Sequence, residues 1–201
     1  LRLTTNLINF ERADTYSGSL YVSEYELSTY MEETIDAFRP YANIKHINLT
    51  YESSFRYLNV WLDKDKMDSI LKNIISNALK YTPDGGNVHV FTSETEDTWS
   101  IEVKDTGIGI PASEQKKLFK MHFRGSNAIN SKVTGSGIGL LLVGKLVHLH
   151  KGKLNFSSME GKGSCIKITF PKGNKHFRKA IQRPQPQNER IVYSASGVPI
   201  N

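Results

Sequence analysis

The chain has 201 residues, a formal net charge of +6 and one cysteine, Cys165. A chain of this length can form one domain with appendages around a substantial hydrophobic core. A single cysteine excludes an internal disulfide, which favours a reducing, cytoplasmic compartment. No apolar run approaches the roughly 18 residues of a transmembrane helix, and the first residues do not resemble a signal peptide, so we expect that this segment does not cross a membrane.

The N-terminal residues have the pattern of the end of an amphipathic helix. Apolar residues recur at helical spacing from Leu1 to Phe10, and Gly18 follows the last of them as a stop. The periodicity of the next segments predicts a strand at 19–26, a helix at 28–41 and strands at 47–52 and 57–62.

A helix predicted at 65–81 has three polar side chains on one face. At about 100° per residue, Asn73, Asn77 and Lys80 fall within an arc of roughly 60°. An amide oxygen is a neutral, hard ligand that suits Mg²⁺ shared with phosphates, and a lysine ammonium can contact a phosphate oxygen as a point charge. Such a stripe by itself is more often a solvated helix face, so its meaning depends on the motifs that follow.

The next motif is an aspartate followed by two glycines. A turn at 83–86 leads to strands predicted at 87–94 and 99–104, and the second strand continues into Asp105, Gly107 and Gly109. Glycines two residues apart allow the backbone to approach a flat ligand. A buried carboxylate accepts hydrogen bonds only, so it would pair with the exocyclic amine of adenine and repel the carbonyl of guanine. In isolation, an aspartate in such a turn is commonly structural.

A third motif, Gly135, Gly137 and Gly139, precedes a helix predicted at 137–150. Glycines before a helix leave unpaired N–H groups and the positive end of the helix dipole for a phosphate. The spacing differs from the dinucleotide-binding fingerprint. It also differs from a P-loop, because Leu146 stands where a Mg²⁺-binding serine or threonine would follow Lys145.

A hairpin predicted at 153–159 and 165–171 completes the order of elements. This mixture of strands and helices predicts a mixed sheet with helices on one face, a two-layer α/β sandwich. Residues 172–201 are basic and contain prolines and many amides, so we expect a linker or disordered tail. Nonspecific nucleic-acid binding is the alternative for this tail, but no aromatic platform or recognition helix accompanies its charges.

The three motifs, in this order, resemble the N, G1 and G2 boxes of the histidine kinase catalytic domain, a branch of the GHKL (Bergerat) ATPase superfamily. Residues 118–124, which read Leu-Phe-Lys-Met-His-Phe-Arg, are similar to its F box. The resemblance covers about residues 20–171, and the fold that it implies is the same two-layer α/β sandwich. It further implies a lid at about 112–134 that is mobile until nucleotide binds.

The resemblance also implies a site for ATP and Mg²⁺. Asn73 and Asn77 would hold the metal, Lys80 and Tyr81 would lie at the phosphates, and Asp105 would bind the adenine amine. We expect the catalytic residues to be Asn73, Lys80 and Arg124. The further nucleotide-binding residues implied by the resemblance are Gly107, Gly109, Ile110, Phe119, Phe123, Gly135, Ser136, Gly137, Ile138, Gly139 and Leu140.

The residue at position 73 indicates which chemistry to expect. Hydrolysing relatives have a water-activating glutamate there, whereas Asn73 is not a useful base near neutral pH. A site without that base should hold ATP intact for transfer to another nucleophile, which favours a kinase over an ATPase. The acceptor is absent from this chain, since none of the six histidines precedes an acidic residue. We expect each of them to be a partly exposed structural histidine.

Residues 1–15 resemble the end of the second helix of the dimerisation and phosphoacceptor hairpin. The predicted organisation is therefore this helix end, a catalytic domain at 16–171 and the basic tail at 172–201. The junction at residues 10–20 is similar to that of hybrid sensor kinases of Bacteroidetes. The implied partners are the chain's own dimerisation domain, in a homodimer, and a response regulator or receiver domain, with no direct nucleic-acid contact.

The sequence thus predicts the ATP-binding catalytic domain of a two-component sensor histidine kinase. The domain would be cytoplasmic, in a full-length receptor at the bacterial inner membrane. Two alternatives stay open: a related protein serine kinase with the same boxes, and an ATP-binding module that signals by closure without phosphoryl transfer.

Overall fold

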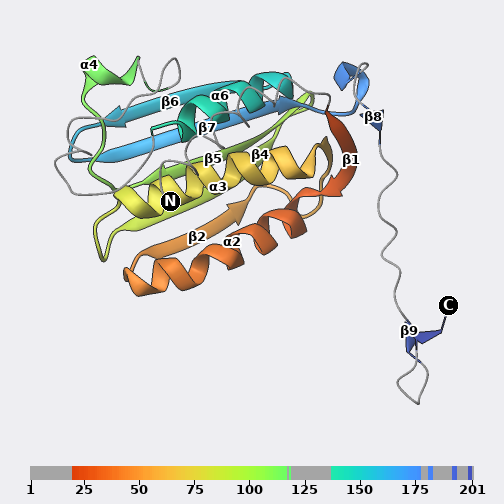
Figure 1. Cartoon of the computed structure of the whole chain (residues 1–201), viewed down its shortest axis with the longest axis horizontal. Coiled ribbons are helices and arrows are strands. Elements are labelled where there is room, and N and C mark those ends of the chain that lie inside the picture. The colour runs from red at the N-terminus through yellow and green to blue at the C-terminus, as the bar shows by residue number, and fades with distance from the viewer. Residues whose placement is uncertain are drawn as a thin grey trace, which may run out of the picture.

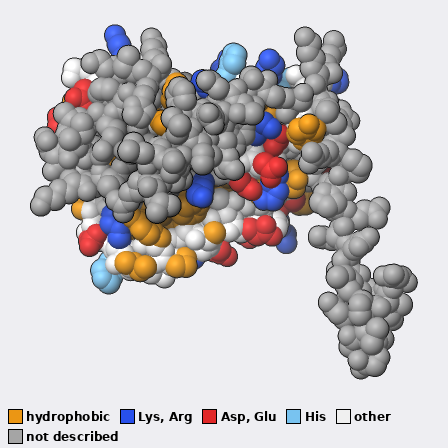
Figure 2. All heavy atoms as spheres, in the orientation of Figure 1, with side chains coloured by type: hydrophobic (Ala, Val, Ile, Leu, Met, Phe, Trp, Pro, Cys, Tyr) orange, Lys and Arg blue, Asp and Glu red, His pale blue; other side chains and the backbone are white. Residues whose placement is uncertain are grey.

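The computed structural model describes residues 20–116, 118 and 137–177, together with three two-residue strands beyond them, and residues that are not described are grey in Figure 1 and Figure 2. These strands are β8 (Ile181–Gln182), β9 (Val192–Tyr193) and β10 (Pro199–Ile200). None of the helices in the described part is long and apolar enough to span a bilayer.

A mixed five-stranded sheet forms one layer of the fold (Figure 1). Its first two strands pair in parallel and the others pair antiparallel. In spatial order the strands are β2 (Asn48–Ser53), β4 (Asn87–Glu94), β5 (Thr98–Asp105), β7 (Gly163–Pro171) and β6 (Lys153–Met159).

Three helices cover one face of this sheet and form the second layer (Figure 1). They are α2 (Leu27–Ile44), α3 (Lys64–Tyr81) and α6 (Gly139–Leu149), with α3 between the other two. Alternate residues of the central strands point into the core, where they meet the apolar face of α3. The arrangement confirms the predicted two-layer α/β sandwich.

The ends of α3 are fixed by its own sequence. Asp63 caps its N-terminus, because Oδ1 accepts a hydrogen bond from the backbone N–H of Lys66. At the other end, Thr82 donates its N–H to Ala78 O, and Pro83 cannot continue the helix. The expected boundaries of this helix therefore differ from the observed ones by a single residue, Lys64.

Helix α2 extends further than the sequence predicted. Its expected end near residue 41 lies one residue after Pro40, yet the helix continues to Ile44. The last turn buries Ala42 in the core, and this packing overrides the hydrogen bond that proline cannot donate. At the start of α2, the Glu26 carboxylate accepts hydrogen bonds from Ser28 N and Thr29 N.

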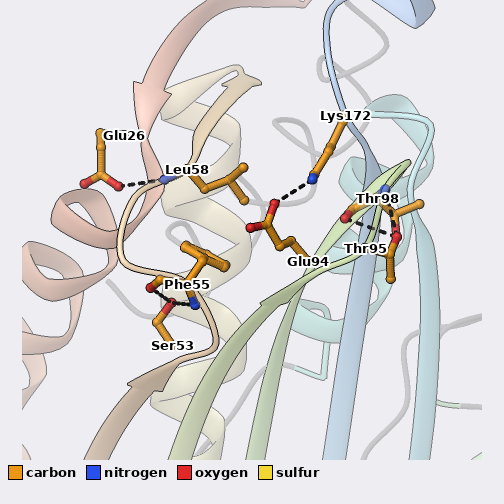
Figure 3. Close-up of polar contacts among 8 residues, drawn as sticks. All are labelled: Glu26, Ser53, Phe55, Leu58, Glu94, Thr95, Thr98 and Lys172. Carbon is orange, nitrogen blue, oxygen red and sulfur yellow. Dashed lines mark hydrogen bonds and ion pairs between the residues drawn. The ribbon is translucent and has the colours of Figure 1, made fainter.

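Polar contacts secure the connections around these elements (Figure 3). Glu26 also accepts a hydrogen bond from Leu58 N, which ties the start of α2 to the loop before β3 (Asn59–Leu62). Lys172, the first residue of the predicted tail, forms an ion pair of 2.5 Å with Glu94 at the end of β4. This contact attaches the beginning of the tail to the folded domain.

The packed domain therefore continues beyond the expected boundary at Pro171. A 3₁₀ helix, η1 (Lys175–Phe177), follows, and Phe177 is 5% exposed in a second cluster with Leu20 and Val22. That cluster lies at a small sheet in which β1 (Tyr21–Glu26) pairs with β3 and, in parallel, with β8. Sequence composition missed Phe177 because one buried aromatic residue is a weak signal in a polar, basic segment.

Candidate functional site

The face of α3 that bears Asn73, Asn77 and Lys80 is half-buried. Asn73 donates a hydrogen bond from Nδ2 to Ser69 O at 2.7 Å, which leaves its carbonyl oxygen Oδ1 as the atom available to a ligand. Within the described structure, the Asn77 amide has no side-chain hydrogen bond. The opposite face of the helix packs into the core through Met67, Ile70, Leu71, Ile74, Ile75, Ala78 and Leu79.

Lys80 and Tyr81 form a pair at the end of the same helix. The Lys80 ammonium lies 4.8 Å from the centre of the Tyr81 ring and 3.3 Å from its hydroxyl. Cation–π attraction holds the ammonium beside the polar face of the helix. A cation in this place can meet an anionic ligand that lies along Asn73 and Asn77.

Asp105 is the last residue of β5, and its two carboxylate oxygens have different surroundings. Oδ1 accepts hydrogen bonds from Gly107 N at 2.8 Å and Ser164 N at 3.2 Å. Oδ2 receives none from the residues that the structure describes. Burial raises the pKa of this carboxyl, and the two N–H groups at Oδ1 oppose that shift by favouring the ionised form. One oxygen thus anchors the turn while the other can accept a hydrogen bond from a ligand.

The glycines after Asp105 are required by the protein's own backbone. A Cβ on Gly107 would lie 2.6 Å from Tyr81 O, and one on Gly109, where φ is 63°, would lie 1.9 Å from Met159 O. Between them, Ile108 donates its N–H to Tyr81 O at 3.1 Å. The turn therefore fits between the end of α3 and the connection from β6 to β7. The sequence interpretation assigned these glycines to ligand contact, and that role stays a prediction.

Two side chains that the sequence analysis did not select hold the next residues of this turn. Ser158 Oγ accepts a hydrogen bond from Ile110 N at 2.8 Å. Gln115, in the short helix α4 (Ala112–Gln115), donates Nε2 to Ile110 O and to Ser158 O. The pairing of β6 with β7, far along the chain, brings Ser158 to the turn, whereas Gln115 reaches back to it from only five residues away. Neither residue type forms a motif that the sequence alone would single out.

The third glycine motif reaches α3 directly. Gly137 has φ of 76°, and α6 begins at Gly139 with no side chain capping its first turn in the described structure. A Cβ on Gly139 would lie 2.4 Å from Asn73 Oδ1. Ile138 is buried, and Leu140 is half-buried in contact with the core. The amide face of α3 and the N-terminus of α6 are therefore neighbours.

The remaining predicted site residues lie outside the described part of the chain. They are Phe119, Phe123, Arg124, Gly135 and Ser136, together with most of the predicted lid and the helix end at residues 1–15. Before the undescribed part of the lid, Leu118 is buried.

The expectation of a partly exposed histidine was wrong for His150, which is 1% exposed. Its Nδ1 lies 2.9 Å from Leu146 O, and its Nε2 accepts a hydrogen bond from Asp63 N. These partners require the neutral ring with the proton on Nδ1, and burial lowers the pKa of the imidazole. His150 is thus a structural residue between α6 and α3.

Residues 62–174 match the family of histidine kinase-, DNA gyrase B- and HSP90-like ATPases. The chain belongs to this family. Sensor histidine kinase WalK of Bacillus subtilis is 35% identical over 173 residues, which are 85% of this chain and 28% of WalK. Histidine kinase P4 of Formosa agariphila is 28% identical over 181 residues, which are 89% of this chain and 13% of that protein. The chain thus spans less than a third of the length of these relatives.

Solved structures with the same fold include histidine kinase domains. The catalytic domain of histidine kinase ThkA in a nucleotide-free form has a TM-score of 0.67 at 23% identity, covering 76% of this chain and 97% of that domain. Full-length ShkA in complex with AMPPNP has a TM-score of 0.74 at 21% identity, covering 86% of this chain and 35% of ShkA. At these identities the likeness establishes the fold.

Proposed function

We propose that this chain is the ATP-binding catalytic domain of a two-component sensor histidine kinase. It would transfer the γ-phosphate of ATP to a histidine on a dimerisation domain outside this chain. The observation that carries the proposal is the contact of Asn73 Oδ1 with Gly139, because it brings the amide-bearing face of α3 to the N-terminus of α6. Family membership and the histidine kinases among the relatives support the same reaction.

The groups on the protein fit an adenine nucleotide. Asp105 Oδ2 would accept the hydrogen bond of an exocyclic amine, and a guanine carbonyl at the same place would be repelled. The first N–H groups of α6 and the Lys80 ammonium would meet the phosphates. AMPPNP, the ligand named for ShkA, is an ATP analogue, which supports the same choice of nucleotide.

The same groups fit a magnesium ion shared with the phosphates. Asn73 and Asn77 would supply neutral amide oxygens, and a bound Mg²⁺ would neutralise phosphate charge during transfer. The amide at position 73 cannot act as a base towards water near neutral pH, so this chain would protect ATP from hydrolysis until the acceptor histidine arrives. From the resemblance we assign further contacts to Tyr81, Phe119, Phe123, Arg124 and Ser136.

The partners follow from the same proposal. Residues 1–15 would be the end of the dimerisation hairpin, so the full-length protein would be a homodimer. A response regulator or receiver domain would take the phosphate. One solved structure of ThkA is a complex with the response regulator protein TrrA, which supports this kind of partner. We further propose a cytoplasmic domain of an inner-membrane hybrid sensor, of the kind found in Bacteroidetes, from the sequence of the junction at 10–20.

Calorimetry with ATP, ADP and GTP, with and without Mg²⁺, tests the nucleotide site. Binding of the adenine nucleotides and rejection of GTP are expected, with ATP affinity dependent on Mg²⁺. Asp105→Asn should weaken ATP binding about tenfold or more, since it places a donor against the adenine amine. Asp97→Asn is the matched control, because Asp97 lies exposed in the β4–β5 turn. No heat from MgATP, or equal affinity in the two variants, would contradict the site.

A second experiment tests the reaction. The chain is mixed with a separate dimerisation hairpin that carries its histidine, together with radioactive ATP. Acid-labile, base-stable phosphate on the hairpin supports the histidine kinase. Acid-stable phosphate on a partner serine would instead indicate the related serine kinase, and binding without transfer would indicate a signalling module. Stable phosphate on the isolated chain would contradict the proposal directly.

A further inference from the structure

Lys45 lies outside every motif of the site, yet its side chain ends at the helix that carries Asn73. It is the first residue after α2, and its ammonium reaches the C-terminal end of α3. Nζ donates hydrogen bonds to Leu79 O at 2.8 Å, to Lys80 O at 3.3 Å and to Thr82 O at 2.5 Å. All three donors of the ammonium are thus directed at carbonyls of one helix end.

These bonds complete the pairing of a helix end that would otherwise need water. The last carbonyls of a helix have no partner within it, and a cation there also opposes the negative end of the dipole. Ala78 O accepts from Thr82 N and Oγ1, and Tyr81 O accepts from Ile108 N. With the three bonds of Lys45, every backbone carbonyl from residue 78 to residue 82 has a donor.

The one carbonyl of this set that reaches the predicted adenine site is Tyr81 O, which receives Ile108 N–H from the turn after Asp105. The carbonyls on both sides of it are held by Lys45. The same oxygen is the atom that leaves no room for a Cβ on Gly107. The orientation of Tyr81 O therefore sets where the Asp105 turn lies relative to α3.

The backbone of Lys45 is itself fixed, so the ammonium has a defined origin. Lys45 N donates to Ala42 O, and Lys45 O accepts from Gly85 N at 3.1 Å. One residue further along the loop after α3, Gly86 O accepts a hydrogen bond from Asn48 N at the start of β2. The end of α2 and the loop after α3 are thus joined by both main chain and side chain.

We propose that Lys45 is a positioning residue for nucleotide binding, which acts by fixing the end of α3 and, through Tyr81 O, the turn that carries Asp105. The inference deepens the proposed function and rests on it. Without the ammonium, three carbonyls turn towards water and the last turn of α3 loosens. The Asp105 turn then loses its fixed hydrogen-bond partner in α3, Tyr81 O. Lys45 touches no nucleotide in this scheme, so its effect is the same for ligands with different numbers of phosphates.

Calorimetry on Lys45→Met, which keeps the stem and removes the ammonium, tests the proposal. We expect affinity for ATP and for ADP to fall by the same factor, about five- to tenfold at a temperature at which each variant is folded. Lys45→Arg should restore affinity to within about twofold, because it returns the charge and the donors. Lys72→Met, which removes an exposed cation from α3 itself, is the matched control and should leave affinity unchanged.

Each other result overturns the proposal. Unchanged affinity with a lower melting temperature would make Lys45 purely structural, and a larger loss for ATP than for ADP would mean that it acts through charge on the phosphates. Failure of Lys45→Arg to restore binding would contradict the role of the carbonyl bonds. If Lys45→Met does not fold, Lys45→Gln, which keeps two donors on a shorter stem, is measured in its place and should lose affinity equally for both nucleotides.

A nucleotide-free measurement separates this proposal from the proposed function. Hydrogen exchange of the Ile108 amide reports the bond to Tyr81 O directly. In Lys45→Met we expect it to exchange about tenfold faster, with core amides of β5 unchanged. If the wild-type chain binds no adenine nucleotide, the proposed function fails. Unchanged exchange at Ile108 in the variant, with binding intact in the wild type, overturns the role of Lys45 alone.

Discussion

The amide oxygen of Asn73 fills the space beside residue 139 that a side chain would need, since a Cβ on Gly139 would lie 2.4 Å from Oδ1. Two motifs that are far apart in the sequence therefore meet atom to atom. The absence of a side chain at Gly139 lets the first turn of α6 approach the helix that bears the predicted metal ligands. This contact gives the glycine a role that backbone flexibility alone does not explain, because its φ is not in the left-handed region.

Gly139→Ala should separate binding from stability. The atom that a Cβ would meet is the end of a flexible side chain, so Asn73 can rotate away while the fold stays intact. Alanine in the first turn of a helix also favours the helix over glycine, by up to about 1 kcal/mol. We therefore expect a melting temperature at or above that of the wild type and MgATP affinity reduced about tenfold or more.

The double variant Asn73→Ala, Gly139→Ala shows whether both residues act at one place. If alanine at 139 acts by displacing the Asn73 amide, the loss of affinity in the double variant should equal that in Asn73→Ala alone. Losses that multiply would mean that Gly139 contributes independently, for instance by backbone contact with phosphate. Lys145→Ala, at an exposed position later in α6, should leave MgATP affinity unchanged.

Asp105→Asn should cost affinity without costing stability. Burial raises the pKa of Asp105 above its unfolded value, so at neutral pH the folded chain holds a charge that burial disfavours. As the pH falls through the folded pKa, the folded state takes up the proton first and its stability rises. Asparagine keeps an acceptor for Gly107 N and Ser164 N and removes the charge. Without nucleotide, the variant should melt no lower than the wild type at pH 7. Any difference in melting temperature in favour of the variant should disappear in acid.

Scanning calorimetry at several pH values checks this expectation. A lower melting temperature of Asp105→Asn at pH 7 would show that the two N–H bonds to Oδ1 need a full negative charge. In that case the main role of the Asp105 carboxylate would be to stabilise the turn. Asp97→Asn, in the exposed turn, should change the melting temperature little at any pH.

The sequence predicted the strands of the sheet and its three covering helices because these depend on local periodicity. The split of α3 into an apolar face and an Asn73, Asn77, Lys80 face follows from helical geometry alone. Prediction from the sequence failed where a contact between distant segments determines the structure. Helix α2 continues past its expected end at residue 41 because Ala42 packs in the core, and His150 is buried because Asp63, far earlier in the chain, supplies its partner.

The same limit applies to the candidate site. Asp105 and the glycines were recognisable from residue type and spacing, but the crowding that makes Gly107 and Gly109 necessary comes from Tyr81 O and Met159 O. Lys45 carries no local signal at all, since a lysine after a helix is ordinary. Only the positions of three carbonyl oxygens around its ammonium give it significance.

Phe177→Ala should show that the domain includes residues beyond Pro171. Phe177 is buried against Leu20 and Val22, so its truncation should lower the free energy of unfolding by about 3–5 kcal/mol. Urea unfolding measures the change. The matched control is Tyr57→Ala, an aromatic residue that is 66% exposed and should cost little. If Phe177→Ala lowers the free energy of unfolding by less than about 1 kcal/mol, the domain ends at Pro171 as the sequence predicted.

His150 should make the domain lose stability in mild acid. Burial lowers the pKa of its imidazole in the folded state, so below about pH 6.5 the unfolded chain takes up a proton that the folded chain does not. Asp63 and Lys66 face the ring with opposite effects on its pKa, and His176 adds a smaller effect in the direction of Lys66. The folded pKa of Asp63 is itself lowered, so its contribution is lost only at lower pH.

We therefore expect the free energy of unfolding to fall from about pH 6.5 to pH 5 by up to about 1.4 kcal/mol per pH unit. His150→Gln should remove most of this slope, since a Gln carbonyl can accept the Asp63 N–H without titrating. His176→Gln should keep most of it, although burial also lowers the pKa of His176, because that residue is only half-buried. An unchanged slope in His150→Gln would mean that other groups cause the loss of stability and that folding does not lower the pKa of the His150 ring.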